Sequence, residues 1–325
     1  MNASPLTCWV MTEGIAGTEN QCIGVAEALG LAPVVKRIKL RAPWRQLSPW
    51  LRWGHSFALA KDSDRCDPPY PDVLIASGRK ALGMARHIKQ ASGGKTYVAV
   101  IQDPRIDPAA FDLVAVPQHD PTRGPNVLLT RTALHRVTPQ KLAAEAAKFT
   151  GQFDHLPPVR VAVLIGGSSK RHTMTAAITQ RLCDRLASLA ARADVGLMIT
   201  ASRRTGVENE AILRNGLRGD NIVFWDGQGP NPYFAFLASA THILVTQDSV
   251  SMTSEALSTG KPVMTIALEG SSRRHALFHS LLQEQGFTRV FDGQLQTWSY
   301  PPLNDTLGVA HKILDDLKTR HKGRA

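Results

Sequence analysis

The fold of the second half of the chain is decided by Thr246-Gln247-Asp248-Ser249-Val250-Ser251-Met252-Thr253-Ser254-Glu255 and the Gly260-Lys261-Pro262-Val263 that follows. An apolar run over 241–245 precedes this stretch and predicts a buried strand. Asp248, Ser249 and Ser251 are residue types that cap helix N-termini, and the glycine is a residue type that ends a helix. The pattern therefore predicts a strand, a polar turn, a helix and a second strand over 263–267.

This polar turn has the chemistry of an anion site. The free amides and the positive dipole of a helix N-terminus suit a phosphate group. Glu255 lies one to two turns inside the predicted helix, where its carboxylate could hold the two hydroxyls of a ribose. An ordinary well-capped turn without a ligand explains the same residues, because Ser, Thr and Asp are common caps.

Two further polar turns follow predicted strands in this half. Gly166-Gly167-Ser168-Ser169-Lys170-Arg171 follows a strand over 161–165, and Ser202-Arg203-Arg204-Thr205 follows a strand over 195–200. Glycines let backbone amides face a phosphate, and cationic side chains offset the charge of a diphosphate. We therefore predict a nucleotide-diphosphate site. Its candidate residues are Gly166, Gly167, Ser168, Lys170, Arg203, Arg204, Asp248, Ser249, Ser251 and Glu255.

Candidate groups for proton transfer lie in the first half of the chain. Glu13 and Glu19 belong to a glycine-containing turn after the first predicted strand, and Asp103 and His119 follow two later strands. Carboxylates and histidines can act as general bases, but ordinary surface loops account for the same residues. No Walker A sequence occurs, and no HExxH or DxD motif stands out, so we predict no metal site.

The length of 325 residues suits two domains, and apolar runs alternate with helical patterns in both halves. This alternation predicts parallel sheets covered by helices. We place an N-terminal Rossmann-like domain on the acceptor side at 1–150 and a C-terminal one on the nucleotide-sugar side at 151–302, with a linker at 151–158. A last amphipathic helix within 303–325 is expected to cross back to the first domain. The predicted fold class is α/β, with two Rossmann-like domains facing a cleft.

The formal net charge of +11 favours an anionic partner, and the absence of nucleic-acid-binding signatures argues against DNA or RNA. The four cysteines show no CxxC spacing, which argues against a zinc site and fits a reducing cytoplasm. The N-terminus does not resemble a signal peptide, and no apolar run approaches the roughly 20 residues of a membrane span. A cytoplasmic location is therefore expected.

One segment, 41–54, contains three of the six tryptophans, Trp44, Trp50 and Trp53, among three arginines. Trp and Arg together suit a membrane interface, where aromatic rings and cations meet lipid headgroups. Packing of the tryptophans against the N-terminal domain is the alternative, and the sequence favours neither. The first possibility predicts a peripheral location at the inner face of the cytoplasmic membrane.

Six motifs together resemble the "elongated mitochondria" fission-factor family. They run in order through the chain: Thr12-Glu13-Gly14-Ile15-Ala16-Gly17-Thr18-Glu19-Asn20-Gln21, Gln102-Asp103-Pro104-Arg105, Gly166-Gly167-Ser168-Ser169-Lys170, Ser202-Arg203-Arg204-Thr205, Asn231-Pro232-Tyr233 and Thr246-Gln247-Asp248-Ser249-Val250-Ser251-Met252. The family is named for a plant factor that recruits a dynamin-related protein to the mitochondrial outer membrane, and it has many bacterial members, which this sequence resembles. The resemblance implies a fold similar to that of GT-B glycosyltransferases.

The residues and the resemblance together predict a metal-independent glycosyltransferase. Its substrate would be a nucleotide-diphosphate sugar, it would need no cofactor, and its acceptor would be an envelope or lipid-linked molecule at the membrane surface. Analogy with sugar-nucleotide enzymes implies that Glu255 binds ribose. Two alternatives remain: a non-catalytic scaffold that recruits a membrane-remodelling partner, and an epimerase or hydrolase that acts on the sugar nucleotide itself.

Overall fold

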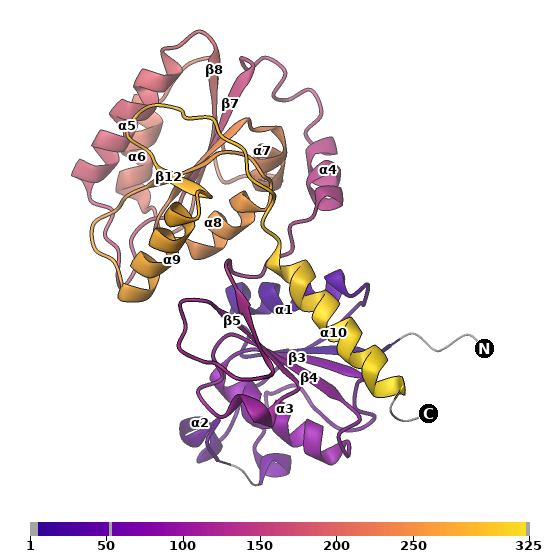
Figure 1. The fold of residues 1–325 in the computed structure, drawn as a ribbon. Coiled ribbons are helices and arrows are strands. Elements are labelled where there is room, and N and C mark those ends of the chain that lie inside the picture. Colours follow the sequence, from indigo (N-terminus) through magenta and orange to yellow (C-terminus); the bar gives the residue numbers. More distant parts are fainter. Residues whose placement is uncertain (1–5, 52–53, 323–325) are drawn as a thin grey trace. The chain divides into compact units, whose positions relative to one another are not determined.

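The computed structural model describes residues 6–51 and 54–322, which form two compact units (Figure 1). Unit 1 combines the residues up to Arg136 with those from Asn304 onward, and unit 2 is the intervening Val137–Leu303. Each unit is built on a parallel sheet of six strands covered by helices. The α/β class and the pair of Rossmann-like units predicted from the sequence are confirmed.

The sheet of unit 1 has the strand order β2-β1-β3-β4-β5-β6. Its strands are β1 (Cys8–Thr12), β2 (Val34–Arg37), β3 (Val73–Ala76), β4 (Tyr97–Ile101), β5 (Leu113–Pro117) and β6 (Val127–Thr130). Its helices are α1 (Ala16–Ala28), α2 (Trp44–Leu47), α3 (Arg79–Ala91) and α10 (Asp305–Lys322), with short 3-10 turns η1 (His55–Phe57) and η2 (Pro108–Ala110). The direction in which the chain adds strands reverses between β1 and β3, and such switch points are where open α/β sheets bind ligands.

The sheet of unit 2 has the order β12-β11-β10-β7-β8-β9. Its strands are β7 (Val159–Ile165), β8 (Val195–Ala201), β9 (Ile222–Phe224), β10 (His242–Thr246), β11 (Val263–Ile266) and β12 (Thr288–Val290). Its helices are α4 (Pro139–Ala147), α5 (Ala176–Ala190), α6 (Val207–Gly216), α7 (Tyr233–Ser239), α8 (Val250–Leu257) and α9 (Arg273–Glu284). Here the order reverses between β7 and β10, which are neighbours and parallel.

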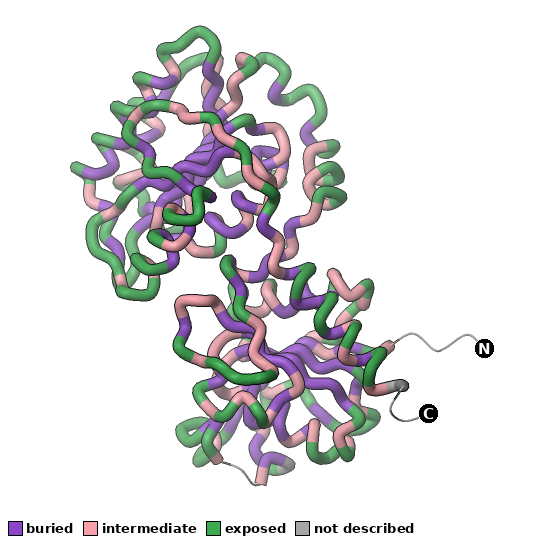
Figure 2. Tube along the Cα trace, in the orientation of Figure 1, coloured by how far each residue is buried: buried purple, intermediate pink, exposed green. Residues whose placement is uncertain are grey.

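The central strands are buried on both faces, as parallel sheets require (Figure 2). Successive residues of a strand point to opposite faces, so Val73 and Ile75 of β3 enter one core cluster while Leu74 and Ala76 enter the other. Unit 2 repeats this arrangement, with α5 and α6 on one face of the sheet and α7, α8 and α9 on the other. The four cysteines are buried free thiols within these cores, so no disulfide contributes.

The boundary between the units lies between Arg136 and Val137 rather than at residue 150. Helix α4 contacts α7 of unit 2, and the segment 151–158 that the sequence suggested as a linker is part of the same core. The Phe153 ring meets Phe236 edge-on with ring centroids 5.2 Å apart, and Leu156 is buried. Apolar side chains spaced among polar neighbours thus anchor this segment.

Helix α10 belongs to unit 1 and packs against α1. Asp305 Oδ2 accepts the Thr132 amide at 2.8 Å, and the Tyr97 hydroxyl donates to Asp316 Oδ2 at 2.6 Å. Leu307, an apolar residue near the start of this helix, is 41% exposed. The buried stripe consists of Val309, Ala310, Ile313 and Leu317.

Replacing Ile313 with Ala should destabilise unit 1, because truncation of this fully buried side chain leaves a cavity between α10 and the sheet. We expect the free energy of unfolding to fall by about 2–5 kcal/mol in urea denaturation. Leu307→Ala, on the exposed side of the same helix, is the matched control and should stay within about 0.5 kcal/mol of the unmodified protein. Equal, small effects of the two variants would show that α10 contributes little to the core.

Candidate functional site

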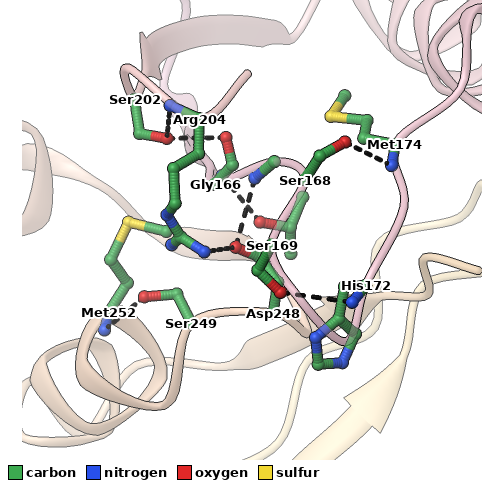
Figure 3. A network of polar contacts seen from close by, with 12 residues as sticks. Gly166, Ser168, Ser169, His172, Met174, Ser202, Arg204, Asp248, Ser249 and Met252 are labelled. Atoms are coloured by element: carbon green, nitrogen blue, oxygen red, sulfur yellow. Dashed lines mark hydrogen bonds and ion pairs between the residues drawn. The ribbon is translucent and has the colours of Figure 1, made fainter. Parts of the chain in front are cut away.

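The candidate site of unit 2 lies at the carboxyl edge of its sheet, at the switch point between β7 and β10. Three loops meet there: 166–173 after β7, 202–206 after β8, and 247–249 between β10 and α8 (Figure 3). These strands are adjacent in the order β10-β7-β8, so their carboxyl ends bring the loops together. The three polar turns, each of which was expected to follow a strand, thus lie at one edge of the sheet.

Asp248 joins the three loops. Its side chain is fully buried, and its Oδ2 forms a 2.7 Å ion pair with Arg204 Nη1 and accepts the Gly167 amide at 3.1 Å. The neighbouring Gly166 amide donates to Thr246 Oγ1 at 2.7 Å. The Asp248 carboxylate, predicted to lie at a phosphate, therefore contacts groups of the protein itself.

The two glycines are required by this close packing of loops. A Cβ at Gly166 would lie 2.2 Å from Asp248 Oδ2. Gly167 has φ +144°, and a Cβ there would lie 2.0 Å from the Arg204 carbonyl oxygen. The Gly166 carbonyl accepts hydroxyl protons from Ser202 and Thr205, each at 2.6 Å. Glycine is thus needed here for contact between loops.

The amides of the loop after β7 are engaged inside unit 2. Gly166 and Gly167 donate as described, the Ser168 amide donates to the Arg204 carbonyl at 3.0 Å, and the Ser169 amide to the His172 carbonyl at 2.8 Å. The expectation that these amides face a phosphate is wrong in this respect, because each already has an acceptor. An anion at this edge would be held by side chains and by another set of amides.

Exposed cationic side chains surround the edge. Helix α9 begins beside the loop after β7. The His172 and His275 rings stack there with centroids 5.0 Å apart, and Arg171 Nη1 donates to Ser272 Oγ at 3.5 Å. The cations at this edge are Lys170, Arg171, Arg203, Arg204, Arg273 and Arg274. In the part of the chain that the structure describes, Lys170 and Arg203 form no ion pair. The two arginines of α9 were missed in the sequence because they lie about 70 to 100 residues beyond the other cations of this edge.

The first turn of α8 offers amides to the same edge. The Ser249 hydroxyl accepts the Met252 amide at 3.2 Å and so caps the helix. The first amides of an α-helix, here those of Val250 and Ser251, have no acceptor within the helix. Ser251 is exposed and Ser249 is buried. The predicted roles therefore separate: Ser249 shapes the turn, while Ser251 faces outward.

Glu255 lies on α8 and is half-buried. Its Oε2 accepts the Tyr233 hydroxyl at 2.5 Å. Burial raises the pKa of the Glu255 carboxyl, although the hydrogen bond from Tyr233 acts in the opposite direction. Tyr233 was not among the predicted site residues; the Asn231-Pro232-Tyr233 motif was its only signal.

In unit 1, Glu13 and Glu19 both pair with cations near the carboxyl end of β1. Glu13 accepts the Lys80 amide at 2.9 Å and forms a 3.0 Å ion pair with its ammonium group. Glu19 binds Arg37 through two hydrogen bonds of 2.9 and 3.0 Å. The hydrogen bond from Arg37 holds the pKa of the Glu19 carboxyl below its usual value, which makes Glu19 a weak base.

Asp103 borders a pocket of about 210 Å³ at the carboxyl end of β4. Its Oδ1 accepts the Arg105 amide and the Thr122 hydroxyl, both at 2.8 Å. Gln102 has φ +76° and Arg105 has φ +56°, the left-handed region that side chains other than glycine rarely adopt. Strain of this kind is concentrated at functional sites. His119, the other candidate, is half-buried in the turn after β5, the neighbouring strand.

Residues 6–51 and 54–322 contain no group of three or more His, Cys, Asp or Glu side chains that could hold a metal ion. No helix within these residues is long and apolar enough to cross a bilayer. Trp44 packs against the core of unit 1, Trp50 is exposed, and Trp53 lies outside the described residues.

Solved structures with a similar fold include UDP-GlcNAc 2-epimerase from Methanocaldococcus jannaschii. Two structures of that enzyme superpose with TM-scores of 0.57 and 0.52, at 12% and 11% identity, over 97% of this chain and 100% of theirs. The second is a complex with UDP-GlcNAc and UDP. This likeness shows the GT-B-type fold that the sequence predicted.

The sequence itself has relatives over nearly its whole length. It is 30% identical to mitochondrial fission protein ELM1 of Arabidopsis thaliana, covering 96% of this chain and 91% of that protein. It is 28% identical to an uncharacterized protein of Rickettsia prowazekii, covering 96% and 99%. The model of the mitochondrial fission ELM1 family matches residues 16–317. With the motifs in order along this span, the chain belongs to the mitochondrial fission ELM1 family.

Proposed function

We propose that the protein binds a nucleotide-diphosphate sugar at the carboxyl edge of unit 2 and transfers the sugar to an acceptor without a metal ion. The observation that carries the proposal is the position of Lys170 and Arg203. Both are exposed, form no ion pair among the residues described, and lie on loops that meet the N-terminus of α8. An anion of high charge density is the ligand that suits such an edge.

The diphosphate would contact side chains and the first turn of α8. Lys170 and Arg203 supply full positive charges, and Ser251 supplies a hydroxyl beside the helix N-terminus. Negative charge grows on the diphosphate as the bond to the sugar breaks, and fixed cations near that charge stabilise the transition state. Arg204 has a different role, because Asp248 holds its guanidinium in the loop network.

The nucleoside would extend along α8 toward Glu255. One oxygen of this carboxylate is taken by Tyr233, and Oε1 makes no hydrogen bond within the described residues. Oε1 would accept a hydroxyl of the ribose, as the analogy with sugar-nucleotide enzymes implied. The UDP-GlcNAc 2-epimerase of similar fold, solved with UDP-GlcNAc and UDP, supports a sugar nucleotide as the ligand class.

We assign the proton-accepting role to Asp103. Glu13 and Glu19 are occupied by Lys80 and Arg37, whereas Asp103 borders a pocket and uses Oδ1 for its hydrogen bonds. A carboxylate in this setting can accept the proton of an acceptor hydroxyl as the sugar is transferred. The acceptor class we propose is an envelope or lipid-linked molecule.

A screen of nucleotides by thermal shift tests the ligand class, because a ligand that binds only the folded protein raises its apparent stability. UDP, GDP, ADP and CDP, each with a corresponding sugar nucleotide, form the panel. Binding with loss of the sugar nucleotide in the absence of an acceptor would favour an epimerase or hydrolase. Binding without any turnover would favour the scaffold.

Arg203→Ala should weaken binding of the nucleoside diphosphate without changing the affinity for the nucleoside, since the guanidinium contacts phosphate only. A charge-assisted hydrogen bond contributes about 1.5–3 kcal/mol, so we expect a loss of about 10- to 100-fold in calorimetry. Arg192→Ala is the control, because Arg192 is an exposed arginine before β8, at the opposite edge of the sheet. An equal loss of affinity for the nucleoside diphosphate and for the nucleoside would show that Arg203 does not contact the phosphate.

Arg204→Ala should instead destabilise unit 2, because it leaves the Asp248 carboxylate buried without its cation. We expect about 1–3 kcal/mol in urea unfolding, below the cost of breaking a fully buried pair since Arg204 is partly exposed. Arg203→Ala, one residue earlier, should change the free energy of unfolding by less than about 0.5 kcal/mol. If the two variants unfold alike, the Asp248 network does not hold the edge together.

Asp103→Asn should lower turnover by about 10²- to 10⁴-fold, the usual contribution of a general base, with no change in nucleotide affinity. The assay follows label from the donor sugar into a lipid extract. Asp67→Asn is the control, because this carboxylate of unit 1 is exposed and pairs with Arg65. If Asp103→Asn kept full activity and His119→Gln lost it, His119 rather than Asp103 would be the general base.

A further inference from the structure

Unit 1 has a second, larger concave site. A groove of about 1020 Å³ lies between the C-terminal half of α3 and the 105–110 segment, with Trp50 at its border. Arg105 borders both this groove and the smaller pocket at Asp103. None of the residues predicted to bind the nucleotide sugar lines the groove, so its chemistry calls for a separate explanation.

The groove is lined by more positive than negative charge. Arg86, Lys89 and Arg105 contribute cations, and Asp107 contributes a carboxylate. Lys89 pairs with Asp112 at 2.7 Å, while Arg105 is exposed and forms no ion pair in the described part of the chain. A concave site with an excess of cations attracts an anion.

The stretch of chain that contains Trp50 exposes apolar side chains. Leu47, Trp50 and Phe57 are 48%, 53% and 67% exposed. The stretch 41–60 that contains them has no Asp or Glu and carries three arginines. Exposed apolar side chains among cations, with no acidic residue, match the composition of protein segments that enter the headgroup layer of anionic bilayers.

Hydrogen bonds tie the described part of this stretch to α3. Arg79 donates to the carbonyls of Arg45 and Gln46 at 3.3 and 3.1 Å, and Arg86 donates to the Leu51 carbonyl at 2.7 Å. A Cβ at Gly83 would lie 2.7 Å from His55 Nε2, so His55 packs directly on α3. Arg79 and Arg86 therefore hold residues 45–51 against α3.

We propose that this groove binds the phosphate group of an anionic lipid at a membrane surface. The phosphate lies between Arg105 and the two cations of α3 that line the groove, Arg86 and Lys89. Leu47, Trp50 and Phe57 enter the headgroup layer of the membrane around it. Arg105 supplies the free guanidinium, and Trp50 links the groove to the apolar rim. The inference is independent of the proposed glycosyl transfer, because it requires neither a donor sugar nor turnover.

Co-sedimentation with vesicles tests the proposal on the full chain. The protein should pellet with vesicles of phosphatidylcholine mixed with phosphatidylglycerol and remain in solution with phosphatidylcholine alone. Arg105→Gln should lower the partition coefficient by about fivefold, which corresponds to about 1 kcal/mol for one basic residue at an anionic surface. Trp50→Ser should lower it by a similar factor, and added salt should weaken binding of the unmodified protein.

Two matched variants in unit 2 control for general charge and apolarity. Arg218→Gln removes an exposed arginine and Val207→Ser an exposed apolar side chain, and both should pellet like the unmodified protein. Glycerol phosphate in calorimetry separates a free phosphate from a lipid. Binding of glycerol phosphate that is lost in Arg105→Gln, with no pelleting on vesicles, would overturn the lipid as occupant. The proposed site would be wrong if the protein pelleted equally with charged and uncharged vesicles. It would also be wrong if the Arg105 and Trp50 variants pelleted as much as the two control variants.

Discussion

A buried carboxylate organises the candidate site of unit 2. Removing a charge from water is costly unless it is paired and hydrogen-bonded, and Asp248 obtains its partners from two other loops, Arg204 after β8 and the Gly167 amide after β7. These loops must therefore approach within hydrogen-bonding distance of β10, which only glycine permits at 166 and 167. This constraint fixes the position of Arg204, the cation that pairs with Asp248.

Two adjacent arginines are thereby given different environments. Arg204 is drawn toward Asp248, whereas Arg203 is left exposed on the same turn. Loops that cradle a phosphate with their amides recognise its shape, because the backbone donors are fixed. At this edge the amides of the glycine turn already donate to acceptors within unit 2. Long cationic side chains would therefore recognise an anion mainly by its charge. Selectivity for a particular nucleoside would then depend on more rigid groups, such as the hydrogen-bonded pair Tyr233 and Glu255.

Much of the fold could be predicted because buried parallel strands are continuous apolar runs with polar turns at their carboxyl ends. The site was predicted less well, for identifiable reasons. The letters Gly-Gly-Ser do not tell whether the backbone amides face a ligand or, as for Gly167, a carboxylate 81 residues away in the sequence. The pairing of Glu19 with Arg37, and of Tyr233 with Glu255, depends on tertiary contacts that no local pattern encodes. The segment 151–158 looked like a linker because its few apolar residues, Phe153 and Leu156, are diluted by polar ones.

The chain path has a consequence for synthesis in the cell. Unit 2 is one continuous stretch of chain that ends at Leu303. Unit 1 also needs α10, which follows unit 2 in the sequence and contributes Val309 and Ile313 to the core of unit 1. Domains tend to fold as units while the chain emerges from the ribosome, N-terminal segments first. Strands β1 to β6 therefore emerge before any residue of α10 and must remain incompletely covered while all of unit 2 is translated. The first domain to begin is thus the last to be completed, and the apolar surface that α10 covers in the folded protein stays uncovered throughout this interval.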